Sequence, residues 1–142
     1  MSLLWSAPDG YGFVRFRGLV IGLAVAWLLP GLVAALALGI QYLIGAPNWG
    51  PDWLLLWATS TLVAISPLLS WLGLILAAPF VAMLLDRGWF GWLPALLTGL
   101  AVGGLMAYLM GTMLALSFGA ALLLILRAAL GRIAPAAFAQ PA

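Results

Sequence analysis

The sequence LPALLTGLAVGGLMAYLMGTMLALSFGAALLLIL, residues 93–126, contains no charged side chain. Two similar apolar stretches precede it, at residues 18–44 and 53–85. A helix needs about 20 residues to cross the hydrocarbon core of a bilayer. Residues 18–44 therefore fit one crossing, whereas each of the other stretches is too long for one untilted crossing. The sequence predicts an all-α integral membrane protein that crosses the bilayer three or four times.

The composition also favours a bilayer over water as the surrounding solvent. Hydrophobic residues make up 67% of the chain and charged residues 6%, and the mean hydropathy is +1.25. Such a chain has too little polar surface to cover a water-soluble globule. Its five arginines and three aspartates are too sparse for the basic patch that a nucleic-acid partner requires. We therefore expect membrane lipids and membrane helices as partners, and no nucleic acid.

Most side chains that perform catalysis or hold metals are missing. The chain has no histidine and no cysteine, which removes the usual ligands of zinc, copper and haem together with the thiol nucleophile. Glutamate and lysine are also absent. Asp86 and Arg87 are adjacent, but no apolar stretch supplies a further titratable group for catalysis or proton relay. We expect no catalytic residue, no cofactor and no metal site.

The charges predict the topology, because positively charged loops tend to stay in the cytoplasm. If residues 93–126 fold back near Met110–Gly111, all five arginines and the N-terminus lie on the cytoplasmic side; if these residues form one helix, the last two arginines lie outside. We favour a bundle of four transmembrane helices, with three long tilted or broken helices as the alternative. The predicted helices cover residues 18–44, 60–85, 90–109 and 112–131. The charges that carry the topology are Arg15, Arg17, Asp86, Arg87, Arg127 and Arg132.

The sequence divides into three regions. Residues 1–17 are expected to form a cytoplasmic amphipathic N-terminal arm, whose aromatic side chains enter the headgroup region while its arginines meet anionic lipid. Residues 18–131 form the transmembrane domain. Residues 132–142 are rich in alanine and proline and are expected to be a flexible tail. Pro67 disfavours helix at the residue before it, so residues 53–65 are predicted to form a separate interfacial helix.

Small residues recur at every fourth position, a pattern that lets transmembrane helices approach closely. A four-residue repeat drifts about 40° per step around a helix, so one partner follows only about 12 residues of it. The long repeat in residues 95–119 must therefore serve two partners or two helices. The predicted helix-packing residues are Gly18, Gly22, Ala26, Gly31, Ala35, Gly39, Gly99, Gly103, Ala107 and Gly111.

Hydroxyl side chains form a polar face on the second apolar stretch. Thr59, Ser66 and Ser70 fall near one line at about 100° per residue. Such hydroxyls usually bond a backbone carbonyl one turn back or a neighbouring helix. A water-filled path along this face is the alternative, although no ionisable residue lies on it.

These observations favour a non-catalytic small subunit of a bacterial inner-membrane complex. Its role would be assembly, anchoring or stabilisation through the small-residue helix faces, against other integral membrane subunits or further copies of itself. The alternatives are a homo-oligomeric pore or holin-like permeabiliser, and a small transporter. Arginine and aspartate replace lysine and glutamate throughout, which suggests a bacterial or phage gene of high GC content.

Overall fold

The computed structural model describes residues 4–7, 9–44, 50–111 and 113–138. These residues contain no strand, and the prediction of an all-α chain is confirmed. Three helices, α1, α3 and α4, are long and apolar enough to cross a membrane, and α2 is an apolar helix bent by 58°. The elements in chain order are α1 (Gly10–Ile44), α2 (Pro51–Asp86), α3 (Trp92–Met110), α4 (Leu114–Ile133) and the short 3-10 helix η1 (Pro135–Phe138).

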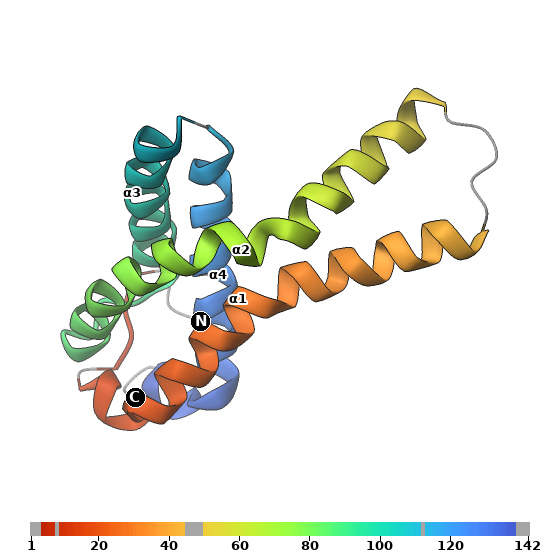
Figure 1. Ribbon diagram of the computed structural model, residues 1–142. Coiled ribbons are helices and arrows are strands. Elements are labelled where there is room, and N and C mark those ends of the chain that lie inside the picture. Colours follow the sequence, from red (N-terminus) through yellow and green to blue (C-terminus); the bar gives the residue numbers. More distant parts are fainter. Residues whose placement is uncertain (1–3, 8, 45–49, 112, 139–142) are drawn as a thin grey trace.

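The last apolar stretch forms two helices that lie side by side, α3 and α4 (Figure 1). Helix α3 ends at Met110, and Gly111 caps it with a φ of 67° while its N–H donates to the carbonyl of Ala107. Glycine adopts this left-handed conformation without the Cβ clash that other residues suffer. The chain therefore folds back at the position the arginines predicted, and residues 93–126 do not form one helix.

Helix α2 begins earlier than the sequence indicated and continues through its internal proline. It starts at Pro51 and bends by 58° between its segments Pro51–Leu68 and Ser70–Asp86. The interfacial helix expected at residues 53–65 lies within the first segment, which leads into the second segment across the bend. The physical reason is that a proline inside a helix can be accommodated by a kink when neighbouring groups satisfy the freed backbone.

A side chain of α1 also bonds the backbone of α2 near the bend. The indole Nε1 of Trp27 donates a hydrogen bond to the carbonyl oxygen of Pro67 over 2.7 Å. One helical turn further along α1, a Cβ on Gly31 would lie 2.6 Å from Cγ of Pro67, so only glycine permits this crossing. Helices α1 and α2 are thus held together where α2 changes direction.

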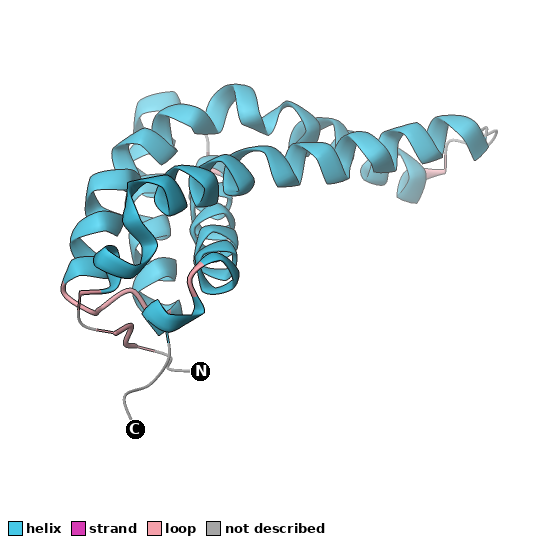
Figure 2. Ribbon diagram, turned by 90° about the horizontal axis from the view of Figure 1, so that it is seen from below, coloured by secondary structure: helices cyan, strands magenta, loops and turns pink. Residues whose placement is uncertain are grey.

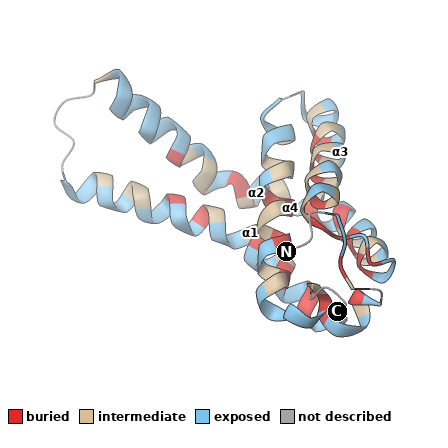
Figure 3. Ribbon diagram, turned by 180° about the vertical axis from the view of Figure 1, so that it is seen from behind, coloured by how far each residue is buried: buried red, intermediate tan, exposed pale blue. Residues whose placement is uncertain are grey.

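Beyond this crossing, α1 and α2 extend together away from α3 and α4, as Figures 1 and 2 both show. We call this extension, residues 31–44 and 51–68, the distal hairpin. Gln41 Nε2 donates to Ser60 Oγ over 3.4 Å within it. Most of its residues are exposed (Figure 3), because no other described helix covers them.

At the opposite end of the molecule, both terminal segments pack together. The N–H of Ser6 donates to the carbonyl of Gly88 over 2.7 Å, and the N–H of Ala7 donates to the carbonyl of Ala137 over 2.8 Å. The start of α1, the end of α2, the start of α3 and the end of α4 therefore meet here, and we call this region the charged end. The arginines on these elements are Arg15, Arg17, Arg127 and Arg132, and Arg87 directly follows α2 as its C-cap.

The described parts of both terminal segments contain helical residues. Residues 10–17, expected in the N-terminal arm, belong to α1, although Arg15 interrupts it with a φ of 55° and a ψ of 166°. Arg132 and Ile133 complete α4, and η1 follows with Ala137 fully buried, so the described part of the expected flexible tail is packed. Residues 1–3, 8 and 139–142 of these two regions lie outside the described residues.

Candidate functional site

The small residues of the last stretch bring two helix backbones into direct contact. A Cβ on Gly99 would lie 2.6 Å from the carbonyl oxygen of Gly119, and a Cβ on Gly103 would lie 2.7 Å from that of Ala115. Any side chain at these glycines would therefore force α3 and α4 apart. The small residues at 95–119 therefore lie on two helices that pack against each other. This is one of the two arrangements that a four-residue repeat permits. Of the other residues predicted for this interface, Ala107 is half-buried and Gly111 is exposed at the turn.

The small residues of α1 are used in two different places. A Cβ on Gly22 would lie 2.7 Å from Cδ2 of Leu130, so α1 packs closely on α4 there. Gly18, Ala26 and Gly31 are also buried.

Ala35 and Gly39 are exposed, and nothing among the described residues lies within 4 Å of a Cβ placed on Gly39. Ala34 is buried in their place. The sequence repeat therefore continues beyond the contacts that α1 makes within its own chain.

The three predicted hydroxyls of α2 have different environments. Thr59 is exposed, and its Oγ1 donates to the carbonyls of Leu55 and Leu56, at 2.8 Å and 3.0 Å, as expected for a threonine in a helix. Ser66 and Ser70 differ, because each Oγ is buried and has no hydrogen-bond partner among the described residues. They do not continue a common outward-facing path with Thr59.

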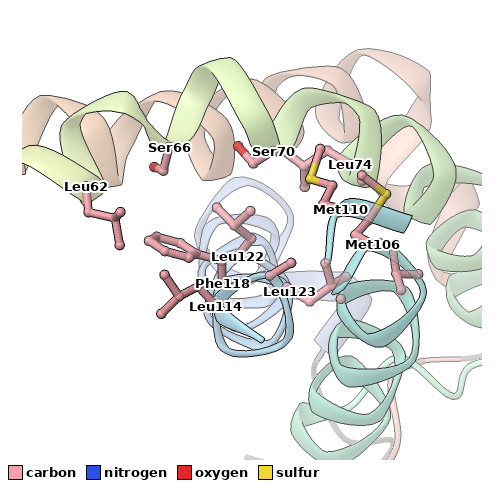
Figure 4. A pocket seen from close by; sticks show the side chains of 15 residues that line it. Leu62, Ser66, Ser70, Leu74, Met106, Met110, Leu114, Phe118, Leu122 and Leu123 are labelled. Carbon is pink, nitrogen blue, oxygen red and sulfur yellow. The ribbon is translucent and has the colours of Figure 1, made fainter. Parts of the chain in front are cut away.

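Ser66 and Ser70 line a cavity of about 180 Å³ that we call the α2 groove. Figure 4 shows both serines on the α2 wall of the groove, facing side chains from the other helices. Helices α3 and α4 form the opposite wall, which is apolar. The labelled residues that line the groove are Leu62, Ser66, Ser70, Leu74, Met106, Met110, Leu114, Phe118, Leu122 and Leu123.

Arg127 departs most from its predicted surroundings. It was predicted as a topology charge on the cytoplasmic side, and only 2% of it is accessible. The ring centroid of Phe138 lies 3.6 Å from its guanidinium carbon and that of Trp92 lies 5.1 Å away. No carboxylate in the described ranges forms an ion pair with it, and its Nε has no acceptor. A Cβ on Gly131 would lie 2.9 Å from its Nη1, so glycine leaves room for the guanidinium.

The other charges that carry the topology prediction are exposed at the charged end. Within the part of the chain that the structure describes, no three His, Cys, Asp or Glu side chains come together as metal ligands could. The remaining topology charges are Arg15, Arg17, Asp86, Arg87 and Arg132.

Comparison with protein-family models, with curated proteins and with solved structures finds no match for this chain.

Proposed function

We propose that this chain is a non-catalytic integral membrane subunit that packs against other membrane helices through its distal hairpin. The observation that carries the proposal is the unused part of the small-residue repeat on α1. Gly31 packs on Pro67 of α2, whereas Ala35 and Gly39 are exposed. Close backbone approach across small residues is a main source of helix association in lipid. A helix from a partner chain would find such an approach at this surface.

The chemistry of the chain supports the same role. Neither histidine nor cysteine is present, and the α2 groove is lined by side chains that do not titrate near neutral pH. General acid–base catalysis and the activation of a nucleophile both require groups that do titrate in this range. Assembly, anchoring or stabilisation of a complex requires only a well-packed helical surface, which this chain can supply.

The arrangement of charges supports a single orientation in the inner membrane of a bacterium. The segments that carry all five arginines meet at one end, so one orientation satisfies the bias of positive charge toward the cytoplasm. We infer four crossings with the charged end in the cytoplasm. Residues 16–44 of α1, which follow the interruption at Arg15, still exceed the length of an untilted crossing and would therefore tilt. Helix α2 would cross as a bent helix.

A pore formed by several copies of the chain receives less support. Its lumen would require polar side chains that face outward from each copy toward a shared axis. The buried hydroxyls of Ser66 and Ser70 face α3 and α4 of their own chain instead.

Site-specific photocrosslinking in native membranes tests the subunit proposal. Leu43 is 83% exposed and lies one turn beyond Gly39, so a photoreactive residue at this position would sample the proposed surface. We expect a discrete adduct with a different membrane protein, and we expect it to disappear in the Gly39→Leu variant. A photoreactive residue at Leu105, which is 51% exposed on α3, is the control for contact with lipid. Adducts only with further copies of the chain, or equal adducts at both positions, would contradict the proposal.

A further inference from the structure

Two serine hydroxyls of α2 lack the partner that hydroxyls in helices normally have. Ser66 is 5% exposed, and the Oγ atoms of both Ser66 and Ser70 are buried with no acceptor in the described structure. On the same helix, the Oγ1 atoms of Thr59 and Thr61 each donate to a carbonyl one turn back, over 2.8 Å. A buried donor without an acceptor is unfavourable, and more so where water is excluded. The pair therefore favours an acceptor supplied from outside the chain.

Both serines line a space large enough to hold such a ligand (Figure 4). The α2 groove has a volume of about 180 Å³, and an apolar protein cavity of about 150 Å³ is known to accept benzene. Gly73 also lines the groove. Even a Cβ placed on it would lie 3.6 Å from Cγ of Met106, which is an ordinary contact distance. The groove therefore has room for one substituted six-membered ring.

The lining of the groove restricts the chemistry of its occupant. Its wall is apolar except for the two serines, and it contains no charged side chain. An ion would lose its hydration without compensation, and an alkyl chain would leave both hydroxyls unpaired. Ser66 and Ser70 lie on the two sides of the bend in α2, and both line the groove. Two such donors match a flat, neutral group with more than one acceptor oxygen.

We propose that the α2 groove binds a lipid-soluble carbonyl compound with a quinone-type ring. The ring lies between α2 and the α3–α4 pair, and its carbonyl oxygens accept hydrogen bonds from Ser66 and Ser70. The apolar tail leaves through the open side of the groove into the surrounding lipid. This site lies on a different surface from Gly39, so it does not depend on the subunit proposal.

Methionine methyl groups provide a local test in the purified full-length chain in lipid nanodiscs. Met106 and Met110 line the groove, whereas Met83 and Met113 do not. With ¹³C-methyl methionine labelling, we expect a benzoquinone with a short alkyl tail to shift the Met106 and Met110 signals saturably and leave the other two unchanged. An alkylbenzene of the same size and tail is the matched probe without carbonyls, and we expect it to bind about tenfold more weakly.

Serine variants test the hydrogen bonds directly. We expect Ser66→Ala combined with Ser70→Ala to weaken quinone binding about tenfold and leave alkylbenzene binding unchanged. Ser117→Ala is the control, because its hydroxyl donates to the carbonyl of Leu114 and lies outside the groove. Gly73→Leu should fill the groove and abolish binding of both probes.

Three outcomes would overturn the proposal. Equal affinity for the two probes, or quinone binding that does not depend on the serines, would make the groove a site for apolar chains alone. Equal shifts of all four methionine methyl groups would indicate partition of the probe into lipid. None of these results bears on photocrosslinking from Leu43, so a failure here is distinguishable from a failure of the subunit proposal.

Discussion

Arg127 is the residue whose environment differs most from that of a typical membrane-protein arginine. A buried guanidinium normally pairs with a carboxylate or reaches the interface. Here the rings of Phe138 and Trp92 lie within 3.6 Å and 5.1 Å of its guanidinium carbon instead. The negative faces of aromatic rings stabilise a cation, by about 2 kcal/mol or more where water is excluded. The cation–π contact with Phe138 therefore stabilises the packing of η1 against α4.

A double-mutant cycle at Arg127 and Phe138 measures this coupling. Phe138→Leu keeps most of the apolar volume but removes the ring, and we expect it to lower the free energy of unfolding by about 1–2 kcal/mol. In an Arg127→Met background the same substitution should cost less than about 0.5 kcal/mol, because no cation remains. Unfolding in mixed micelles gives both values. An equal cost in the two backgrounds would mean that Phe138 contributes packing only.

The sequence could not predict this environment. Arg127 follows an apolar run and has Arg132 five residues later, which is typical of an interfacial cationic segment. Its burial depends on contacts between distant parts of the chain, including the hydrogen bond from Ala7 to Ala137 that holds η1 against the N-terminal segment. Local spacing contains no signal for such a contact. Gly131, one turn after Arg127, is the only nearby residue that could have indicated it.

The α3–α4 pair shows how small residues define an element. Gly99 and Gly103 contact the backbone of α4 around Ala115 and Gly119. If the pair lies in lipid as proposed, the helices gain little from burying apolar side chains against each other, so close van der Waals contact contributes much of the association energy. Such contact depends on the absence of side chains at a few positions.

We expect Gly103→Leu to be far more damaging than Leu105→Ala. A side chain at Gly103 would overlap the carbonyl oxygen of Ala115, 2.7 Å from its Cβ, and overpacking of this kind costs about 1–3 kcal/mol or more. Leu105 is 51% exposed, so its truncation should change stability by less than about 0.5 kcal/mol. The denaturant midpoint of each purified variant provides the comparison. Equal midpoints would remove the packing role assigned to Gly103.

Trp27 supplies a side-chain hydrogen bond at the α1–α2 crossing. Trp27→Phe retains an aromatic ring but removes the N–H that donates to Pro67 O over 2.7 Å. We expect a loss of about 1 kcal/mol in the free energy of unfolding. Trp71→Phe is the matched control, because Trp71 is 49% exposed on α2. A similar loss in both variants would show that indole size, and not the hydrogen bond, accounts for the effect.

Element boundaries could be predicted where local chemistry determines them. The end of α3 follows from Gly111, whose left-handed conformation caps the helix, and the predicted helices at residues 90–109 and 112–131 lie within two residues of α3 and α4. The predicted helices at residues 53–65 and 60–85 together cover most of α2. The contacts of Trp27 and Gly31 with Pro67 could not be predicted, because they come from another helix. The helices that pack on the small residues of α1 could not be predicted either. A sequence repeat does not show which of its positions contact helices of their own chain.

At the scale of the whole molecule, the two ends have different surfaces. The charged end joins both terminal segments through the hydrogen bonds of Ser6 and Ala7. The distal hairpin extends from the other end and exposes large apolar side chains such as Leu36, at 68%, and Leu43, at 83%. If the chain lies in a membrane as proposed, lipid or partner helices cover this hairpin, while the arginines keep the opposite end in the cytoplasm.

Cysteine labelling tests this orientation directly, because the chain contains no cysteine of its own. Gly12 and Ala136 are exposed at the charged end, Gly50 precedes α2, and Met113 is 85% exposed at the α3–α4 turn. With four crossings, a membrane-impermeant thiol reagent should label Gly50→Cys and Met113→Cys in spheroplasts. Gly12→Cys and Ala136→Cys should react only after permeabilisation, and all four should react in detergent. Labelling of Met113→Cys from the same side as Gly12→Cys would exclude the four-crossing arrangement, since the α3–α4 turn would then lie on the cytoplasmic side.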